Sequence, residues 1–211
     1  MRVLTFLHSF EPGGVERVAL RLVREWRQSG QDAPLFMGRN DGALRAELAE
    51  ELEYDVPSPR WWTAGLETLW MIVTLPGVIR DYDPDVLFCA GNTYTVVVMA
   101  MKLLLGRRCP PVVSKVSNEL LRPGHGPLMC RLYRGWGWLQ SKFVDTWVVM
   151  HPTMRAQVRG LCPSREIAVV PDPALTLDKW RPCALGDHEM ALKAVEGLSP
   201  WGDLFRKKTI R

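Results

Sequence analysis

The sequence lacks the long apolar segments that mark membrane-spanning and secreted proteins. A transmembrane helix needs about 20 predominantly apolar residues, whereas the longest apolar stretch, residues 93–105, is shorter and contains Lys102. The chain starts with one arginine and a short strand-like run, with no long apolar core and no small-residue cleavage site. We therefore expect neither a membrane span nor a signal peptide.

Cysteine is too sparse and too scattered to build a framework. The five cysteines are odd in number and never form a C-x-x-C pair: Cys89, Cys109, Cys130, Cys162 and Cys183. Such spacing indicates neither a disulfide scaffold nor a zinc site. A reducing compartment is the simplest setting, so we expect a cytoplasmic protein.

A large excess of one charge is also missing. The 211 residues are 47% hydrophobic and 24% charged, as in ordinary globular proteins, and carry a formal net charge of +4 with a pI near 8.9. This mildly basic balance suits an anionic ligand or an anionic membrane surface without requiring either. Because the basic residues are dispersed, except for a short cluster at the C-terminal end, we expect no nucleic-acid partner.

What the sequence does contain is a regular alternation of strand-like and helical segments. Strands are expected over residues 3–7, 33–37, 54–56, 86–89, 112–116, 146–150 and 167–170. Helices are expected over residues 15–26, 42–53, 65–80, 93–105, 128–141 and 153–159, the third of them interrupted near Pro76. Alternating strands and helices imply right-handed crossovers and a parallel sheet.

This pattern predicts the fold class α/β: a doubly wound, mostly parallel, Rossmann-like sheet forming a single domain over residues 1–173. Residues 174–211 contain no strand-like run, one short helical pattern and a basic end. They are too few to build a second core. We expect them to form a short irregular or helical tail.

Ligands of open α/β sheets bind where the strands end, and the first such loop carries Gly13 and Gly14. Glycines let a ligand approach the main chain, and the following helix offers unpaired amides and a partial positive charge to a phosphate. The loop matches neither G-x-G-x-x-G nor G-x-x-x-x-G-K-[ST], so a tight turn is an equally good interpretation. Glu16 and Arg17 fit simple surface charges of the first helical turn, where Glu16 favours the helix dipole.

Four later loops follow strand ends, and the last of them, with Pro171, Asp172 and Pro173, is interpreted as a rigid exit from the sheet. Asn92 is interpreted as the N-cap of the next helix rather than as a ligand contact, and Ser117 or Asn118 as caps in their turn. Glu119 becomes a general base only if the cleft raises its pKa. His151 suits contact with a phosphate or hydroxyl, but a side chain satisfied by the backbone is the simpler interpretation.

Tryptophans gather in two predicted helical regions. The residues concerned are Trp61, Trp62, Trp70, Trp136 and Trp138. We interpret most of them as core packing. A face that touches a membrane or a second domain is the alternative.

Three segments in order carry a resemblance to a known family. The "GGVERVALRLVREW" segment, the "PDVLFCAGN" strand and loop, and the "VVPDPA" exit resemble the N-terminal domain of family 4 glycosyltransferases of the GT-B fold. There a GG-x-E-R loop, a PDV strand and a VIPNPV-like linker occur in the same order. The resemblance covers residues 1–175.

The resemblance implies a domain that holds the acceptor, while a second domain binds a nucleoside diphosphate sugar as co-substrate and no metal takes part. Gly13 and Gly14 would contact the donor diphosphate through backbone amides. The residues expected on the acceptor side are Glu16, Arg17, Asn92, Ser117 and Asn118. The catalytic candidates are Glu119 and His151. A sugar or lipid-linked acceptor and a peripheral position at the inner face of the membrane are further expectations.

The sequence departs from the family pattern in three places. Many relatives carry a histidine and an acidic residue where this chain has Ser117, Asn118 and Glu119, and serine is common at the position of His151. The family's donor domain has a "GR…KG" segment and two glutamates in E-x7-E spacing. Here Glu189 and Glu196 are one residue too close. We therefore expect no complete donor domain in this chain, and a truncated or diverged tail.

Three functions remain open on the sequence alone. The first is hexosyl transfer, weak or absent in this chain by itself. The second is a non-catalytic binding subunit that completes a split glycosyltransferase with a donor-domain partner chain. The third is an unrelated doubly wound domain that binds a phosphorylated ligand at Gly13 and Gly14.

Overall fold

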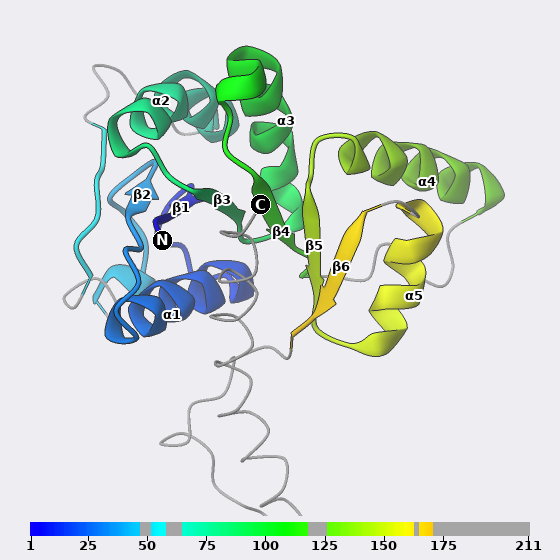
Figure 1. Cartoon of the computed structure of the whole chain (residues 1–211), viewed down its shortest axis with the longest axis horizontal. Helices are drawn as coiled ribbons and strands as arrows, with labels where there is room; N and C mark the ends of the chain where they lie inside the picture. The colour runs from blue at the N-terminus through cyan, green and yellow to red at the C-terminus, as the bar shows by residue number, and fades with distance from the viewer. Residues whose placement is uncertain (47–51, 58–64, 118–125, 163–164, 171–211) are drawn as a thin grey trace, which may run out of the picture.

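The computed structural model describes residues 1–46, 52–57, 65–117, 126–162 and 165–170 (Figure 1). Six strands alternate with five α-helices in these ranges. The strands are β1 (Val3–Leu7), β2 (Leu35–Met37), β3 (Val86–Cys89), β4 (Val112–Lys115), β5 (Thr146–Val149) and β6 (Glu166–Val169). The helices are α1 (Gly14–Gln28), α2 (Glu67–Tyr82), α3 (Thr95–Leu105), α4 (Pro127–Ser141) and α5 (Pro152–Leu161), with 3-10 turns η2 (Asn92–Tyr94) and η3 (Gly106–Arg108).

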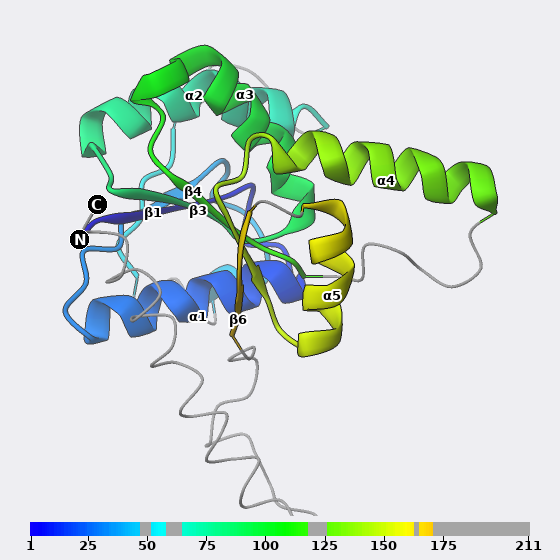
Figure 2. The same ribbon diagram turned by 45° about the vertical axis from the view of Figure 1, so that its right-hand side comes forward.

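All strand pairs are parallel, in the order β2-β1-β3-β4-β5-β6. Helix α1 covers one face of the sheet and helices α2 and α3 cover the other (Figures 1 and 2). The chain leaves β1 in one direction toward β2 and returns to β3 on the other side, so the order reverses between β1 and β3. In open α/β sheets this switch point is where ligands bind.

The core lies between the sheet and its helices because most strand residues are apolar and buried. All five residues of β1 and all four of β3 are buried, as expected for parallel strands covered on both faces. Helix α1 adds an apolar stripe that includes Val18, Leu22 and Trp26. The predicted α/β class and parallel Rossmann-like sheet are confirmed.

The expected interruption at Pro76 is wrong, because α2 runs unbroken through it. Met71, Leu75 and Ile79 recur every fourth residue and are buried, so the packing of this face outweighs the hydrogen bond that proline removes. The expected strand over residues 54–56 is reduced to an isolated bridge between Phe36 and Asp55.

The prediction that the tryptophans pack in the core is wrong for two of them. Trp136 and Trp138 on α4 are 42% and 54% exposed, whereas Trp70 is half-buried and its indole donates to the Gly38 carbonyl at 3.2 Å. Trp61 and Trp62 lie outside the described residues, as do residues 47–51 of the helix expected over residues 42–53 and the whole tail from residue 174. No helix in the described ranges is both long and apolar enough to cross a bilayer.

Candidate functional site

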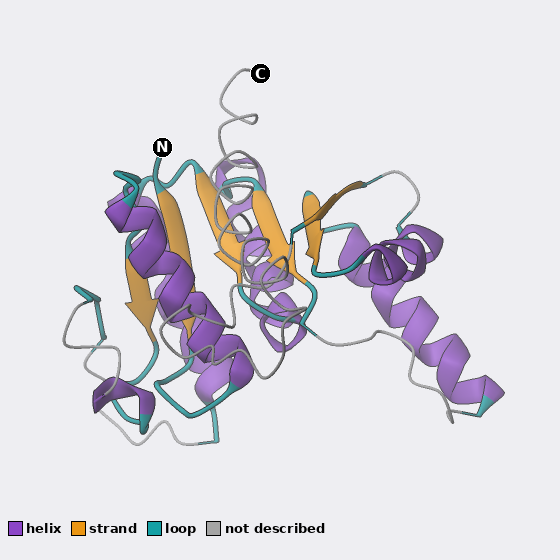
Figure 3. Ribbon diagram, turned by 90° about the horizontal axis from the view of Figure 1, so that it is seen from below, coloured by secondary structure: helices purple, strands orange, loops and turns teal. Residues whose placement is uncertain are grey.

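The candidate site lies at the carboxyl ends of β1 and β3, beside the first turn of α1. Figure 3 shows the sheet from below, with its strands and α1 in view. Three loops meet here: the one that follows β1, the Gly91–Asn92 turn after β3, and Ser117 beyond β4. This edge holds the switch point of the sheet.

The Glu16 side chain folds back over Gly13 instead of extending into solvent. A Cβ at Gly13 would lie 1.9 Å from Glu16 Oε2, so the absence of a side chain makes room for the carboxylate. The Tyr94 hydroxyl donates to Glu16 Oε1 at 2.6 Å. Burial raises the pKa of Tyr94, and the charge of Glu16 adds to the shift. Glu16 therefore joins α1 to the turn after β3.

Gly13 and Gly14 differ in what surrounds them. The Gly13 amide already donates to the Glu11 carbonyl at 2.7 Å. A Cβ at the exposed Gly14 would meet no atom within 4 Å, and as the first residue of α1 Gly14 has an amide without an intrahelical acceptor. Of the two glycines predicted to contact a phosphate, Gly14 is the one whose amide a ligand can approach without obstruction.

His8 lies directly after β1 and stacks on Tyr94. Their ring centroids are 4.6 Å apart, and His8 Nε2 is buried without a hydrogen-bond partner among the described residues. Burial lowers the pKa of His8, against the opposing charges of Glu67, Glu16 and Glu11. The lowered pKa favours the neutral imidazole, whose Nε2, without a partner among the described residues, is open to a ligand donor.

The turn after β3 packs closely against α1. A Cβ at Gly91 would lie 2.8 Å from Val15 Cγ1 and 3.1 Å from Ser117 Oγ, and Ser117 donates to the Ala90 carbonyl at 3.1 Å. The predicted N-cap role of Asn92 is wrong, because the 3-10 turn begins at this residue and α3 only at Thr95. Asn92 Oδ1 is buried with no partner within the described ranges.

His151 occupies a separate place at the end of β5. It precedes α5, and its Nδ1 accepts from the Thr153 amide at 3.3 Å and lies 2.9 Å from the Thr153 hydroxyl. The side chain thus acts as the N-cap of α5, which is the simpler of the two interpretations. Since β4 stands between β3 and β5, His151 does not belong to the group around Gly14.

The structure brings four predicted residues together and leaves the others apart. Glu16, Gly14, Asn92 and Ser117 come from the loops that meet at the switch point, with Gly13 beneath the Glu16 carboxylate. Arg17 follows them on α1 and is half-buried with interactions of its own. The two remaining candidates, Asn118 and Glu119, lie outside the described residues.

The sequence interpretation missed His8 and Tyr94. His8 had a usable signal, because it is the first polar residue after an apolar strand. Tyr94 had none, since its contact with Glu16 joins residues 78 positions apart. In the part of the chain that the structure describes, no three histidine, cysteine, aspartate or glutamate side chains gather as metal ligands.

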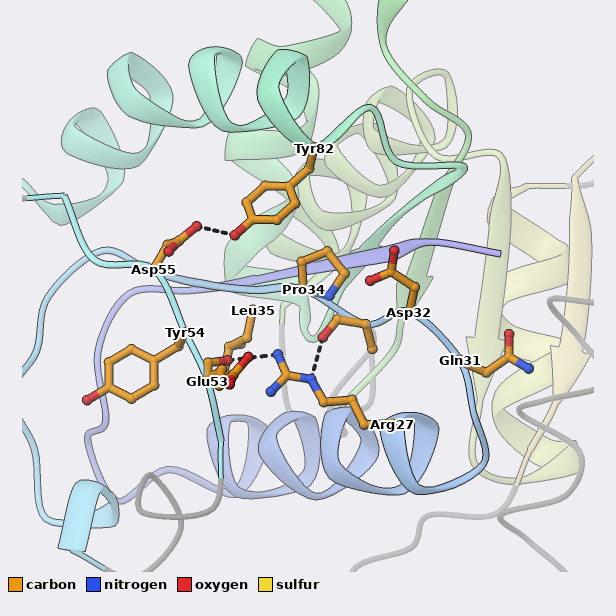
Figure 4. A pocket seen from close by; sticks show the side chains of 10 residues that line it. Arg27, Gln31, Asp32, Pro34, Leu35, Glu53, Tyr54, Asp55 and Tyr82 are labelled. Atoms are coloured by element: carbon orange, nitrogen blue, oxygen red, sulfur yellow. Dashed lines mark hydrogen bonds between the residues drawn. The ribbon is translucent and has the colours of Figure 1, made fainter.

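A polar hollow of about 390 Å³ lies at the opposite edge, where β2 begins (Figure 4). Arg27 donates to the carbonyls of Ala33 and Glu53 at 2.9 and 2.7 Å. The Tyr82 hydroxyl donates to Asp55, which raises the pKa of Tyr82 to about 12. These contacts tie α1 and α2 to the residues around β2, so we assign this hollow a structural role.

A family model described as glycosyl transferase 4-like domain matches residues 13–173. The chain belongs to this glycosyltransferase family. The match begins at Gly13 and takes in the whole switch-point group except His8. No sequence relative was found among curated proteins.

Solved structures with the GT-B fold share the architecture of this glycosyl transferase 4-like domain. The lipopolysaccharide outer core galactosyltransferase WaaB has a TM-score of 0.58 at 15% identity, over 89% of this chain and 50% of that one. Staphylococcus aureus MnaA with UDP gives 0.58 at 13% identity, over 87% and 49%. Anabaena HepE with UDP-glucose gives 0.55 at 13% identity, over 82% and 44%. The chain spans about half the length of these proteins.

Proposed function

We propose that this glycosyl transferase 4-like domain is the acceptor half of a transferase that moves a hexosyl group from a nucleoside diphosphate sugar to an acceptor. The observation that carries the proposal is the open first turn of α1 at the switch point. Nothing in the described structure requires glycine at position 14, where a Cβ would meet only empty space. A ligand that approaches the main chain supplies the requirement.

The chemistry that suits this turn is stabilisation of a diphosphate leaving group. Cleavage of the sugar–phosphate bond leaves negative charge on the diphosphate, and helix N-terminal amides bind such charge without reorganising. The Glu16 carboxylate lies over Gly13, where it would repel an anion, and the hydrogen bond from Tyr94 holds it there. We place the diphosphate over Gly14 for this reason.

The acceptor hydroxyl is assigned to the side lined by His8 and Asn92. Each has a buried polar atom, Nε2 and Oδ1, without a partner among the described residues, and buried polar atoms are normally hydrogen-bonded. An acceptor hydroxyl can donate to an unprotonated His8 Nε2, while Asn92 Oδ1 accepts from a second hydroxyl of the same molecule. A neutral His8 can also accept the proton that the acceptor loses during transfer.

UDP and UDP-glucose are the ligands named for the solved neighbours MnaA and HepE, so we propose a uridine diphosphate sugar as the donor. Because the chain spans about half of those proteins, the nucleoside would be bound by a second half, in the same polypeptide or on a partner chain. We expect this chain alone to bind the diphosphate weakly and to transfer little sugar. A partner role in a split transferase is compatible with the same site.

The proposal can be tested by amide NMR titration of the full chain with UDP-glucose and with UDP. We expect the largest shifts at Gly14, Val15 and Asn92. Gly14→Val should weaken binding at least tenfold because the valine covers the first turn, and the fold should be kept because a Cβ at this position meets no atom within 4 Å. Gly77→Ala on α2 is the matched control, since a Cβ there also meets nothing within 4 Å.

Shifts confined to other parts of the chain would refute the proposed site. Equal affinity of wild type and Gly14→Val would do the same for the role of the first turn. If inorganic phosphate or a simple phosphometabolite produced the shifts while neither UDP nor UDP-glucose did, a phosphoryl-binding domain of another kind would replace the transferase.

A further inference from the structure

Helix α4 presents most of its large apolar side chains to solvent. Leu128, Leu132, Trp136 and Leu139 are 72%, 60%, 42% and 37% exposed. Their spacing of i, i+4, i+8 and i+11 places them on one face of the helix, which we call the apolar stripe of α4. A contiguous exposed apolar face on a folded domain marks an interaction surface.

Among the described residues, the contacts that anchor α4 gather in its last two turns. Gln140 Nε2 donates to Thr95 Oγ1 at 2.6 Å, and Arg165 donates to the carbonyls of Ser141 and Lys142 at 2.9 and 3.0 Å. A Cβ at Gly137 would lie 3.0 Å from Leu161 Cδ1, so α5 packs directly against this turn. In Figures 1, 2 and 3 the N-terminal end of α4 projects away from the sheet.

A basic stripe runs along α4 next to the apolar one. The basic residues of this stripe are Arg131, Arg134 and Lys142. Trp138 lies at i+7 from Arg131, and Lys142 Nζ lies 4.6 Å from the centroid of its ring. Residues 126–143 contain no aspartate or glutamate. Arg131 and Arg134 are exposed and have no acidic partner among the described residues.

We propose that α4 docks on an anionic lipid bilayer, with the apolar stripe in the acyl-chain boundary and the basic stripe at the phosphate level. Leucine and tryptophan on one side and arginine on the next are the composition of helices that lie in a membrane interface. Anionic phospholipids supply the negative charge that the basic stripe lacks within the protein.

A second copy of the chain fits this surface less well. Pairing two identical surfaces about a two-fold axis brings each patch onto its own copy. Because residues 126–143 contain no aspartate or glutamate, the α4 helix of a second copy would offer the arginines no opposite charge. A bilayer buries the apolar stripe while the arginines stay at the charged surface.

Docking would also bring the domain to acceptors that are anchored in the bilayer. The strand arrowheads and the first turn of α4 lie toward the same side of the molecule in Figure 3. This consequence rests on the proposed function, and it names the acceptor class as a lipid-anchored molecule.

The docking itself is tested by flotation of the full chain with phosphatidylcholine vesicles, with and without about a third of phosphatidylglycerol. We expect strong flotation with the anionic vesicles and at least tenfold weaker binding to neutral ones. The paired substitution Leu128→Glu with Leu132→Glu should abolish flotation. Arg131→Gln with Arg134→Gln should weaken binding to anionic vesicles about 30-fold, the effect of two basic residues near such a surface.

Val73→Glu on α2 is the matched control, because Val73 is 72% exposed, as is Leu128. It should float like the wild type, and melting curves should be alike for all variants. Failure of the wild type to bind anionic vesicles would overturn docking, as would equal loss in Val73→Glu. So would a lipid-free dimer that Leu132→Glu dissociates, since α4 would then be a protein interface.

Vesicle binding needs no nucleotide sugar, so the two proposals fail separately. Flotation without UDP-glucose shifts would retain docking and remove the transferase site. UDP-glucose shifts at Gly14 without flotation would retain the site and remove the lipid-anchored acceptor.

Discussion

Helices α1 and α4 are each 15 residues long, and each follows a glycine that comes after a parallel strand. Seven residues of α1 are buried, including Leu20, Leu22 and Trp26. In α4 burial is confined to Gly137, Gln140 and Ser141 in the last two turns, although the helix is rich in leucine and tryptophan. Two helices of similar pattern thus serve opposite purposes: one closes the core and the other offers its apolar face outward.

The comparison predicts its largest effect for matched leucine truncations. Leu22→Ala should lower the free energy of unfolding by about 2–5 kcal/mol, because Leu22 is 0% exposed and its truncation leaves a cavity in the core. Leu132→Ala should change stability by less than about 0.5 kcal/mol, since Leu132 is 60% exposed. Urea unfolding of both variants decides the point. Similar losses would mean that α4 is covered.

A smaller loss is expected at the contact that joins α1 to the turn after β3. Tyr94→Phe removes the donor to Glu16 and leaves a half-buried carboxylate unsatisfied, at a cost of about 1–3 kcal/mol. Tyr54→Phe is the control, because the Tyr54 hydroxyl bonds to Asn40 at an exposed site. Chemical unfolding at pH 7 measures both. Equal stability of Tyr94→Phe and wild type would contradict the role of this bond.

Glycine-to-alanine substitutions should change the stability of the protein in opposite directions in the two regions. Gly135→Ala in α4 meets no atom within 4 Å and should stabilise the protein by about 0.5–1 kcal/mol, the helix preference for alanine over glycine. Gly91→Ala forces a Cβ to 2.8 Å from Val15 on α1 and should destabilise it. Thermal unfolding gives both signs. A neutral Gly91→Ala would mean that α1 packs loosely on this turn.

The smallest effect is expected from pH. Burial lowers the pKa of His8 from 6.5, so below about pH 6.5 the unfolded chain binds a proton that the folded chain refuses. The unfolded state then holds more protons, and stability decreases as the pH falls through this window. Between pH 7.5 and 5.5, the melting temperature of His8→Gln should fall by less than that of the wild type. Identical losses would show that His8 does not titrate as its burial requires.

Much of the fold could be predicted because periodicity reports local structure directly. The run at Val3–Leu7 is apolar except for Thr5 and the run at Val86–Cys89 is wholly apolar, and both form parallel strands as expected. The error at Pro76 arose because a local rule about proline takes no account of α3, against which α2 packs. A tertiary contact overrode a local preference there.

The site could be predicted only to the level of loops. Gly14, Asn92 and Ser117 stand at strand ends, and strand ends meet at one edge of a parallel sheet. The bond between Glu16 and Tyr94, and the stacking of His8 on Tyr94, depend on how α1 and η2 sit across the switch point. No spacing along the chain encodes these distances.

By itself the sequence determined the order of strands and helices, the parallel sheet and the loops where a ligand would bind, because these follow from hydrophobic period and chain direction. The tertiary structure alone decided that Glu16 covers Gly13 and leaves Gly14 open, and that α4 points its leucines outward. A periodic pattern shows that one face of a helix is apolar. What covers that face depends on neighbours brought there by the rest of the fold.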